Sequence, residues 1–146
     1  MIYEQFIVEG KNTVVRDGTL RDLDHYIAIA KSRFPVHSIF SLTKKEIKEY
    51  LSTRQMIVAE RQKKIIGGNV IVVKSSSASH GVFRYNHLAV SKPFEKMGAG
   101  SALMRASDNY VLAIMKLNGL RTAKIELYMS ENEKKAPSFF NNSESH

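Results

Sequence analysis

Residues 87–103 read HLAVSKPFEKMGAGSAL, and this stretch carries the strongest structural signal in the chain. Residues 88–90 fit the end of a buried strand, Pro93 fits a turn, and Gly98 and Gly100 open a long helical pattern. The first N–H groups of a helix have no intrahelical acceptor, and the helix dipole adds about half a positive charge there. Because glycine has no Cβ, an anion can approach these amides closely, and the stretch predicts a diphosphate site. The alternative is a helix that begins with Gly-Ala-Gly only for tight packing.

Two other glycine motifs fit this stretch less well. A P-loop requires Lys followed by Ser or Thr after its last glycine, and no such pair follows Gly100. A dinucleotide-binding fingerprint begins directly after a strand and has a third Gly or Ala. Here seven residues separate Val90 from Gly98, and Leu103 stands at the third position. Glu126 lies near the acidic position of that fingerprint, so the dinucleotide alternative stays open.

Length and composition predict one globular domain over residues 1–146. The net charge of +8 favours an anionic partner, which could be a polyphosphate ligand, a nucleic acid or a membrane surface. The absence of cysteine excludes disulfides and thiolate metal sites and suits a reducing cytosol, so we expect a cytoplasmic protein. No apolar run approaches the ~20 residues that cross a bilayer, and the N-terminus lacks the pattern of a secretory signal.

Hydrophobic periodicity predicts an α/β or α+β domain with the order β-α-α-β-β-β-α-β-α. Thr19 can cap the first helix and Pro35 ends it, a capping box of Thr43 and Glu46 begins the second, and Gly119 ends the long one. The expected strands cover residues 13–16, 55–60, 65–73, 82–90 and 123–129, and a final short helix falls within 130–142. The buried stripe expected on the long helix comprises Leu103, Ala106, Tyr110, Ile114 and Leu117.

The segment after residue 87 resembles the acyl-CoA-binding motif of the GNAT N-acetyltransferase superfamily. That motif has Gln or Arg, two further residues, Gly, one residue, and then Gly or Ala. Residues 95–100 match both glycines, while Glu95 stands at the Gln or Arg position. Residues 15–23 are similar to the usual opening of the family, and the pattern from Asn132 to Phe140 is similar to its N-x-x-A-x-x-F-Y. The resemblance covers residues 13–140.

The resemblance implies a GNAT-like mixed sheet, acetyl-CoA as co-substrate, and a small-molecule or peptide amine as acceptor. The family continues beyond this point into two further strands that close the sheet, and the sequence shows neither. We therefore expect these strands to be missing or supplied by a partner, such as a second copy that pairs with an open edge after Met129. The coenzyme-binding residues that the resemblance implies are Leu88, Ala89, Val90, Glu95, Lys96, Met97, Gly98, Ala99, Gly100, Ser101 and Asn132.

The mechanism implied by the resemblance is direct attack of the amine on the thioester in a ternary complex. An amine with a pKa near ~10.4 must first lose a proton, for which Glu126 and His87 are candidates. The family tyrosine that protonates the leaving thiolate falls at Phe140, so Tyr128 is the candidate that replaces it. Each of the three could instead have only a structural role. The histidines show no i, i+4 pair, and we expect no metal site.

Three hypotheses follow from the sequence. The first is an N-acetyltransferase that uses acetyl-CoA. The second is a GNAT-like protein that binds CoA but is catalytically impaired, because of Phe140 and the absent strands. The third is a basic nucleic-acid-binding domain, which rests on the charge alone, since no RNP-like aromatic and basic motif is present.

Overall fold

The computed structural model describes residues 6–8, 13–33, 42–86, 88–94, 98–127 and 136–141, and at 6–8 and 136–141 it describes the backbone alone. The chain contains both helices and strands, as the sequence predicts. In chain order the elements are β1 (Phe6–Val8), β2 (Thr13–Asp17), the 3₁₀ turn η1 (Leu20–Asp22), α1 (Leu23–Arg33), α2 (Lys44–Ser52), β3 (Met56–Arg61), β4 (Lys64–Ser76), β5 (His80–Tyr85), β6 (Ala89–Val90), the 3₁₀ turn η2 (Lys92–Phe94), α3 (Ala99–Asn118), β7 (Thr122–Leu127) and β8 (Ala136–Asn141).

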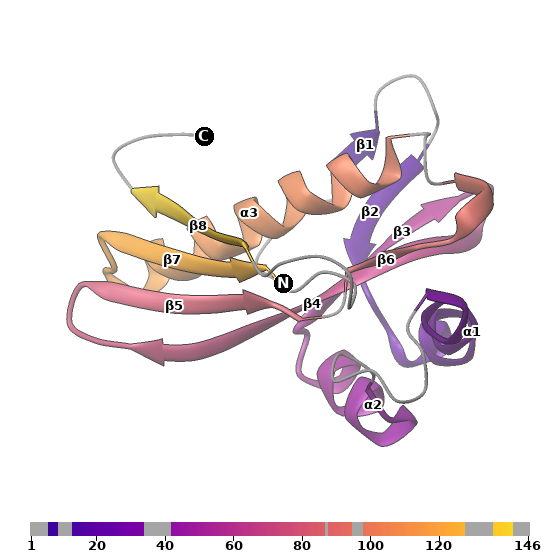
Figure 1. The fold of residues 1–146 in the computed structure, drawn as a ribbon, viewed down its shortest axis with the longest axis horizontal. Helices are drawn as coiled ribbons and strands as arrows, with labels where there is room; N and C mark the ends of the chain where they lie inside the picture. The colour runs from indigo at the N-terminus through magenta and orange to yellow at the C-terminus, as the bar shows by residue number, and fades with distance from the viewer. Residues whose placement is uncertain are drawn as a thin grey trace.

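Within the described residues, eight strands form one mixed sheet. Its order is β1-β2-β3-β4-β5-β7-β8, and the short β6 pairs with β4. Neighbouring strands run antiparallel except β5 and β7, which are parallel and are joined through α3. Figure 1 shows α3 on one side of the sheet and α1 and α2 on the other. The mixed α/β architecture predicted from the sequence is therefore confirmed.

Each face of the sheet has its own hydrophobic core. On the α3 face, Leu103 and Met115 belong to one fully buried cluster with Phe83 and Ile125 of the sheet. Burial of large apolar side chains contributes about 1.5–3 kcal/mol each, so this cluster fixes α3 firmly over β5 and β7.

The opposite face is covered by α1 and α2. Tyr26 of α1 and Leu51 of α2 pack with Val58 and Val70 of the sheet. The capping box predicted for α2 is present. The Thr43 hydroxyl accepts a 3.1 Å hydrogen bond from the Glu46 N–H, and Glu46 Oε1 accepts a 3.0 Å bond from the Thr43 N–H.

The stripe predicted for α3 is correct at its start and wrong at its end. Leu103 and Tyr110 are buried, but Leu117 is 72% exposed. A seven-residue step leaves a helical side chain about 20° away from its starting direction, so the predicted stripe drifts off the sheet. Val111 and Met115 are fully buried and continue the contact instead. The helix ends as predicted, at Gly119 with a φ of 67°.

The strand predicted over residues 82–90 is divided in two. Ile71 of β4 pairs with Tyr85, whereas Gly68 pairs with Ala89, so two intervening residues on β4 correspond to three on the other strand. This one-residue excess is a bulge, which ends β5 and turns β6 onto the first half of β4.

The short helix predicted within residues 130–142 is wrong for residues 136–141, which form β8. β8 pairs antiparallel with β7, and Ala123 faces Phe140 in the register. Pro137 has no N–H for a helical hydrogen bond, while a sheet edge tolerates proline. The edge of β7 is therefore occupied by the chain itself and is not open to a second copy over these residues. Expectations that concern Met129 and Asn132 fall outside the described residues.

Candidate functional site: the edge of β6 and the start of α3

β5 and β7 form a regular parallel pair. Their register runs from His80 and Thr122 to Tyr85 and Leu127. Beyond the bulge, β6 pairs with β4 and, within the described residues, with no other strand. Among the described residues, the side of β6 that faces away from β4 therefore has no strand partner, and residues 128–135, which follow β7, lie outside them.

The main-chain groups of this edge can be assigned from the β4 pairing. The Ser91 N–H donates a 2.8 Å hydrogen bond to the Ile66 carbonyl of β4. Main-chain groups of successive residues in a strand point to opposite sides, so the N–H and C=O of Val90 point away from β4. Val90 consequently offers a donor and an acceptor to any extended ligand that lies along the edge.

Two glycines of β4 allow close approach, Gly67 to β6 and Gly68 to α1. A Cβ at Gly67 would lie 2.7 Å from the carbonyl oxygen of Ala89. At Gly68, a Cβ would lie 2.7 Å from the ring of Tyr26. Real Cβ atoms do not come so near to other atoms, so both positions require glycine for close approach. Beside Gly67, the register between β3 and β4 shifts by one residue between Ala59 and Glu60.

The start of α3 faces this region. Gly98 precedes the helix in the left-handed conformation, with a φ of 84°, which side chains rarely adopt. The first amide bonded in the helical pattern is that of Ala102, which donates a 3.0 Å hydrogen bond to the Gly98 carbonyl. The amides of Ala99, Gly100 and Ser101 precede it and have no acceptor within the helix.

Among the described residues, space remains beside the Cα of Gly100. A Cβ at Gly100 would meet nothing closer than Val90 Cγ2, at 3.9 Å. Gly100 therefore does not fill a packing requirement among the described residues, which counts against the tight-packing alternative at this position. An anion could approach the amides and the positive end of the helix dipole from this side.

The turn between β6 and α3 adds positive charge. η2 contains the exposed Lys92, and the Phe94 N–H donates a 2.9 Å bond to the Ser91 carbonyl. The guanidinium carbon of Arg61 lies 5.9 Å from the centre of the Phe94 ring, a cation–π distance. Two cations thus flank the approach to the helix start.

The structure describes seven of the eleven coenzyme-binding residues predicted from the sequence. It brings residues 88–90 and 98–101 to the β6 edge and the adjoining start of α3. The other predicted coenzyme residues, together with two of the catalytic candidates, lie outside the described residues: Glu95, Lys96, Met97, Asn132, His87 and Tyr128.

The geometry agrees with a comparison against protein families. Residues 52–142 match the family described as "Acetyltransferase (GNAT) domain". The chain belongs to the GNAT acetyltransferase family. Among curated proteins, no sequence matches it significantly.

Solved structures show the same GNAT fold. Ard1 from Thermoplasma volcanium has a TM-score of 0.59 at 19% identity, and the match covers 84% of this chain and 75% of that one. N-acetylglutamate synthase from Neisseria gonorrhoeae, complexed with coenzyme A and L-arginine, has a TM-score of 0.54 at 16% identity, with coverage of 78% and 24%. Rv2747 from Mycobacterium tuberculosis, in complex with CoA and NLQ, has a TM-score of 0.55 at 15% identity, with coverage of 77% and 63%. This GNAT chain thus spans about a quarter of the synthase and less than two thirds of Rv2747.

Glu126 is the described catalytic candidate of this GNAT domain. Its side chain is 8% exposed, and its Oε1 accepts a 2.9 Å hydrogen bond from Lys74 Nζ. Arg84 Nε lies 3.7 Å from the same oxygen, and Lys124 Nζ lies 3.8 Å from Oε2. Glu126 is therefore surrounded by cations, an arrangement that favours a carboxylate anchored as an anion.

Two buried polar pairs under the site were missed by sequence reasoning. The Tyr85 hydroxyl donates a 2.6 Å hydrogen bond to Asp108 Oδ1, and burial together with that carboxylate raises the pKa of Tyr85. Asn69 is fully buried and donates through Nδ2 to the Ser107 hydroxyl at 2.8 Å. These pairs connect the last residue of β5 and the middle of β4 to α3. No sequence motif marks them, because the partners lie 23 and 38 residues apart.

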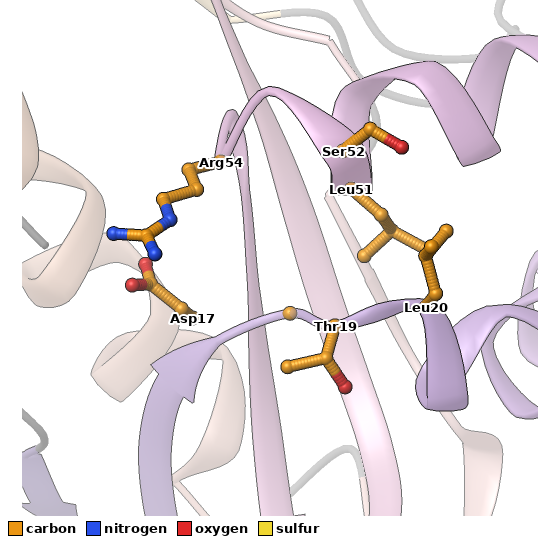
Figure 2. A pocket seen from close by; sticks show the side chains of 7 residues that line it. Asp17, Thr19, Leu20, Leu51, Ser52 and Arg54 are labelled. Atoms are coloured by element: carbon orange, nitrogen blue, oxygen red, sulfur yellow. The ribbon is translucent and has the colours of Figure 1, made fainter.

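A cavity of about 340 Å³ lies elsewhere in this GNAT domain, between the end of β2 and the turn after α2. Figure 2 shows the Arg54 side chain pointing toward the Asp17 carboxylate. Asp17 Oδ1 is buried and makes no hydrogen bond among the described residues. The cavity shares no residue with β6 or the start of α3, so it is separate from these two elements. Its lining comprises Asp17, Gly18, Thr19, Leu20, Leu51, Ser52 and Arg54.

No helix within the described ranges is long and apolar enough to cross a membrane.

Proposed function

We propose that this GNAT protein transfers the acetyl group of acetyl-CoA to a primary amine by direct attack in a ternary complex. Two features support the proposal: the outer edge of β6, which has no strand partner among the described residues, and the adjoining amides at the start of α3, which have no acceptor within the helix. The coenzyme diphosphate would be held by the amides of Gly100 and Ser101, and by the residues at 95–97 that the sequence motif supplies.

The extended arm of the coenzyme would lie along β6 as an added strand. The outward N–H and C=O of Val90 supply main-chain hydrogen bonds of the kind used in strand addition. Leu88 lies two residues earlier and would present its groups to the same side. One of these N–H groups would polarise the thioester carbonyl by donating to its oxygen. The main-chain N–H and C=O of Ala89 face β4, so Ala89 would lie beside the coenzyme without a main-chain hydrogen bond to it.

Proton transfer is assigned to the three candidates from the sequence. The acceptor amine must lose a proton before it attacks, and Glu126 and His87 are the proposed bases. Tyr128 is the proposed acid for the leaving thiolate. Holding amine and thioester together in the right orientation supplies a large part of the rate in such a mechanism, so the chain needs no covalent intermediate.

Relatives support coenzyme A as co-substrate. Rv2747 from Mycobacterium tuberculosis was solved in complex with CoA, and a GNAT-like decarboxylase, GphF, in complex with isobutyryl-CoA. The Neisseria gonorrhoeae synthase was also solved with coenzyme A and N-acetyl-glutamate. These complexes support an acyl-CoA ligand and leave the acceptor of this chain as a proposal. We further propose that residues 1–146 act as one domain and that the reaction takes place in the cytoplasm, in line with the absence of cysteine.

The alternative is a protein that binds CoA without turnover. Its sequence basis is Phe140 at the position of the family tyrosine. The structure places Phe140 in β8, opposite Ala123, and not in a helix, so the expected equivalence with a helical tyrosine does not hold. The alternative now rests on the absence of a demonstrated acid.

Release of free thiol from acetyl-CoA with a panel of amines tests the proposal. Gly100→Val should lower CoA affinity at least tenfold, because a branched side chain enters the space before the amides. Gly100→Ala is the matched control and should retain binding, since a single Cβ has room. Binding without thiol release would favour the alternative. Equal CoA affinity in both variants would overturn the placement of the coenzyme. A salt-sensitive shift with DNA or RNA that CoA does not affect would favour the nucleic-acid hypothesis.

A further inference from the structure

The cavity of about 340 Å³ between the end of β2 and the turn after α2 has opposite charges in its wall. Asp17 is the last residue of β2, and Arg54 belongs to the turn that leads from α2 to β3. Figure 2 shows the Arg54 side chain pointing toward the Asp17 carboxylate. Within the described residues, neither side chain makes a hydrogen bond or an ion pair. The cavity thus contains one anion and one cation that no direct contact neutralises.

The Asp17 carboxylate lacks the donors that an acid in a protein wall needs. Its Oδ1 is buried and accepts no hydrogen bond from a described residue. A buried charge without a partner costs free energy, because the protein does not replace the water that solvated it. The position of Asp17 is fixed by the sheet, since its backbone pairs with Ile57 of β3. A cationic group of a ligand would supply the missing compensation.

Arg54 has a backbone conformation that side chains rarely adopt. Its φ is 59°, in the left-handed region that favours glycine. Two hydrogen bonds hold it there. The Arg54 N–H donates to the Leu51 carbonyl at 3.3 Å, and the Arg54 carbonyl accepts a 2.8 Å bond from the Tyr110 hydroxyl. Arginine at a position that glycine would occupy with less strain indicates a function for its side chain.

The apolar part of the cavity wall comes from two leucines. Leu51 is 4% exposed, whereas Leu20 is 52% exposed. Thr19, Ser52 and Arg54 are also exposed, so solvent reaches this part of the wall. The apolar part of a ligand would cover the Leu20 side chain, which is favourable because it removes apolar surface from water.

The cavity is remote from the elements proposed to hold the coenzyme. In the sheet, β3 and β4 lie between β2 and β6. At about 4.8 Å between neighbouring strands, β2 is roughly 14 Å from β6. A small molecule in the cavity and an extended ligand along β6 can therefore be bound at the same time.

We propose that the cavity binds a free α-amino acid with an apolar side chain, at a site separate from that of the coenzyme. The site is independent of the proposed acetyl transfer. An α-amino acid carries an ammonium and a carboxylate group on one carbon, so a single molecule would compensate both Asp17 and Arg54. The guanidinium can donate two parallel hydrogen bonds to the carboxylate. A volume of about 340 Å³ is at the lower end for ligand sites, which suits a molecule of this size.

Calorimetric titration with L-leucine and two of its analogues tests the inference. 3-Methylbutylamine lacks the carboxylate of leucine, and 4-methylpentanoate lacks its ammonium group. We expect leucine to bind at least tenfold more tightly than either analogue, with and without saturating CoA. Equal affinity for the three compounds would overturn the inference, as would the absence of saturable binding by leucine, valine, isoleucine and methionine.

Two variants assign the charges of the site. Arg54→Gln should lower leucine affinity at least tenfold and remove the preference over 3-methylbutylamine. Asp17→Asn should remove the preference over 4-methylpentanoate. Arg121→Gln makes the same chemical change at an exposed residue before β7 and is the control that should leave leucine binding unchanged. CoA affinity should be the same in all three variants. Unchanged leucine binding in Arg54→Gln would contradict the site.

NMR of the unmodified protein keeps the inference testable even if Asp17→Asn does not fold. Backbone amide shifts are recorded on titration with leucine. The amides of Gly18, Thr19, Leu51 and Ser52 should shift, while those of residues 98–102 should not. Shifts that are absent from these four residues would place the bound amino acid outside the cavity and overturn the inference.

Discussion

The carbonyl oxygen of Ala89 lies 2.7 Å from the place that a Cβ would occupy on Gly67. A methyl group there would also lie 3.2 Å from Leu103 Cδ1 and 3.3 Å from the Val90 Cα. Gly67 therefore lies between β6 and the first turns of α3, the two elements of the coenzyme site. Its missing side chain sets how close these elements come to the sheet.

Gly67→Ala should displace β6 and weaken CoA binding. The inserted methyl group meets backbone atoms, which cannot rotate away, so we expect a loss of about 1–3 kcal/mol in the free energy of unfolding. Urea unfolding and calorimetric titration with CoA measure the two effects. Gly119→Ala is the control, since its φ of 67° makes it destabilising by roughly 1–2 kcal/mol at the other end of α3. Equal CoA affinity in the two variants would show that the β4–β6 contact does not control binding.

Gly100→Ala should stabilise the chain while CoA still binds. Gly100 is in the first turn of a helix, and a Cβ there has no neighbour closer than 3.9 Å. Alanine in place of glycine within a helix typically adds about 0.5–1 kcal/mol. Thermal unfolding with and without CoA measures both properties. A destabilised protein would indicate that the helix start has less space than the described residues show.

The stability of the protein should fall above pH 10, and Tyr110 should account for part of the loss. Burial, together with the nearby Asp17 charge, raises the pKa of Tyr110 from 10.0 to about 12. Below pH 10 both folded and unfolded states keep the proton. Above it the unfolded chain loses the proton first, which favours unfolding by up to about 1.4 kcal/mol per pH unit until pH 12.

Tyr110→Phe separates this contribution from the lysines and the other tyrosines. The variant loses the 2.8 Å hydrogen bond from the Tyr110 hydroxyl to the Arg54 carbonyl, so it should be about 1 kcal/mol less stable at pH 8. The difference between the two proteins should shrink above pH 10 and change sign before pH 12, because a loss of about 1.4 kcal/mol per pH unit exceeds the contribution of about 1 kcal/mol from the hydrogen bond. A difference that stays constant over this range would contradict a raised pKa for Tyr110.

Tyr128→Phe should lower kcat about 10²-fold without changing KM for acetyl-CoA, if its phenol protonates the thiolate. Tyr50→Phe on α2 is the control with the same chemical change. The pH profile of kcat/KM should lose its alkaline limb in the first variant and retain it in the second. An unchanged kcat in Tyr128→Phe would remove this residue from the mechanism.

Local signals in the sequence predicted the elements well. Thr43 and Glu46 form the capping box that their spacing indicates, and Gly119 ends α3 in the left-handed conformation. Gly98 and Gly100 indicated the start of α3 because two closely spaced glycines directly before an amphipathic pattern are typical of a turn that leads into a helix. Such features depend on residues within one or two turns of each other, which is the range over which a sequence pattern is informative.

Features that depend on distant partners were not predictable. The segment 130–142 is polar and then aromatic, a pattern from which we predict a short helix. Residues 136–141 form a strand instead, because they pair with β7. The division of β5 from β6 follows from a one-residue register excess against β4, which no local pattern encodes. The cations around Glu126 come from three strands, so the sequence identified the carboxylate as a candidate base but not its surroundings.

The parallel alignment of β5 with β7 has a consequence for the folding kinetics. These strands can meet only after the whole of α3 has crossed the sheet, and closing so long a loop precedes any gain from their hydrogen bonds. The proposed coenzyme site combines β6 with the start of α3, so it is complete only when that crossover has formed. CoA binding should therefore appear only in the last phase of refolding. Added CoA should slow unfolding and leave the folding rate unchanged.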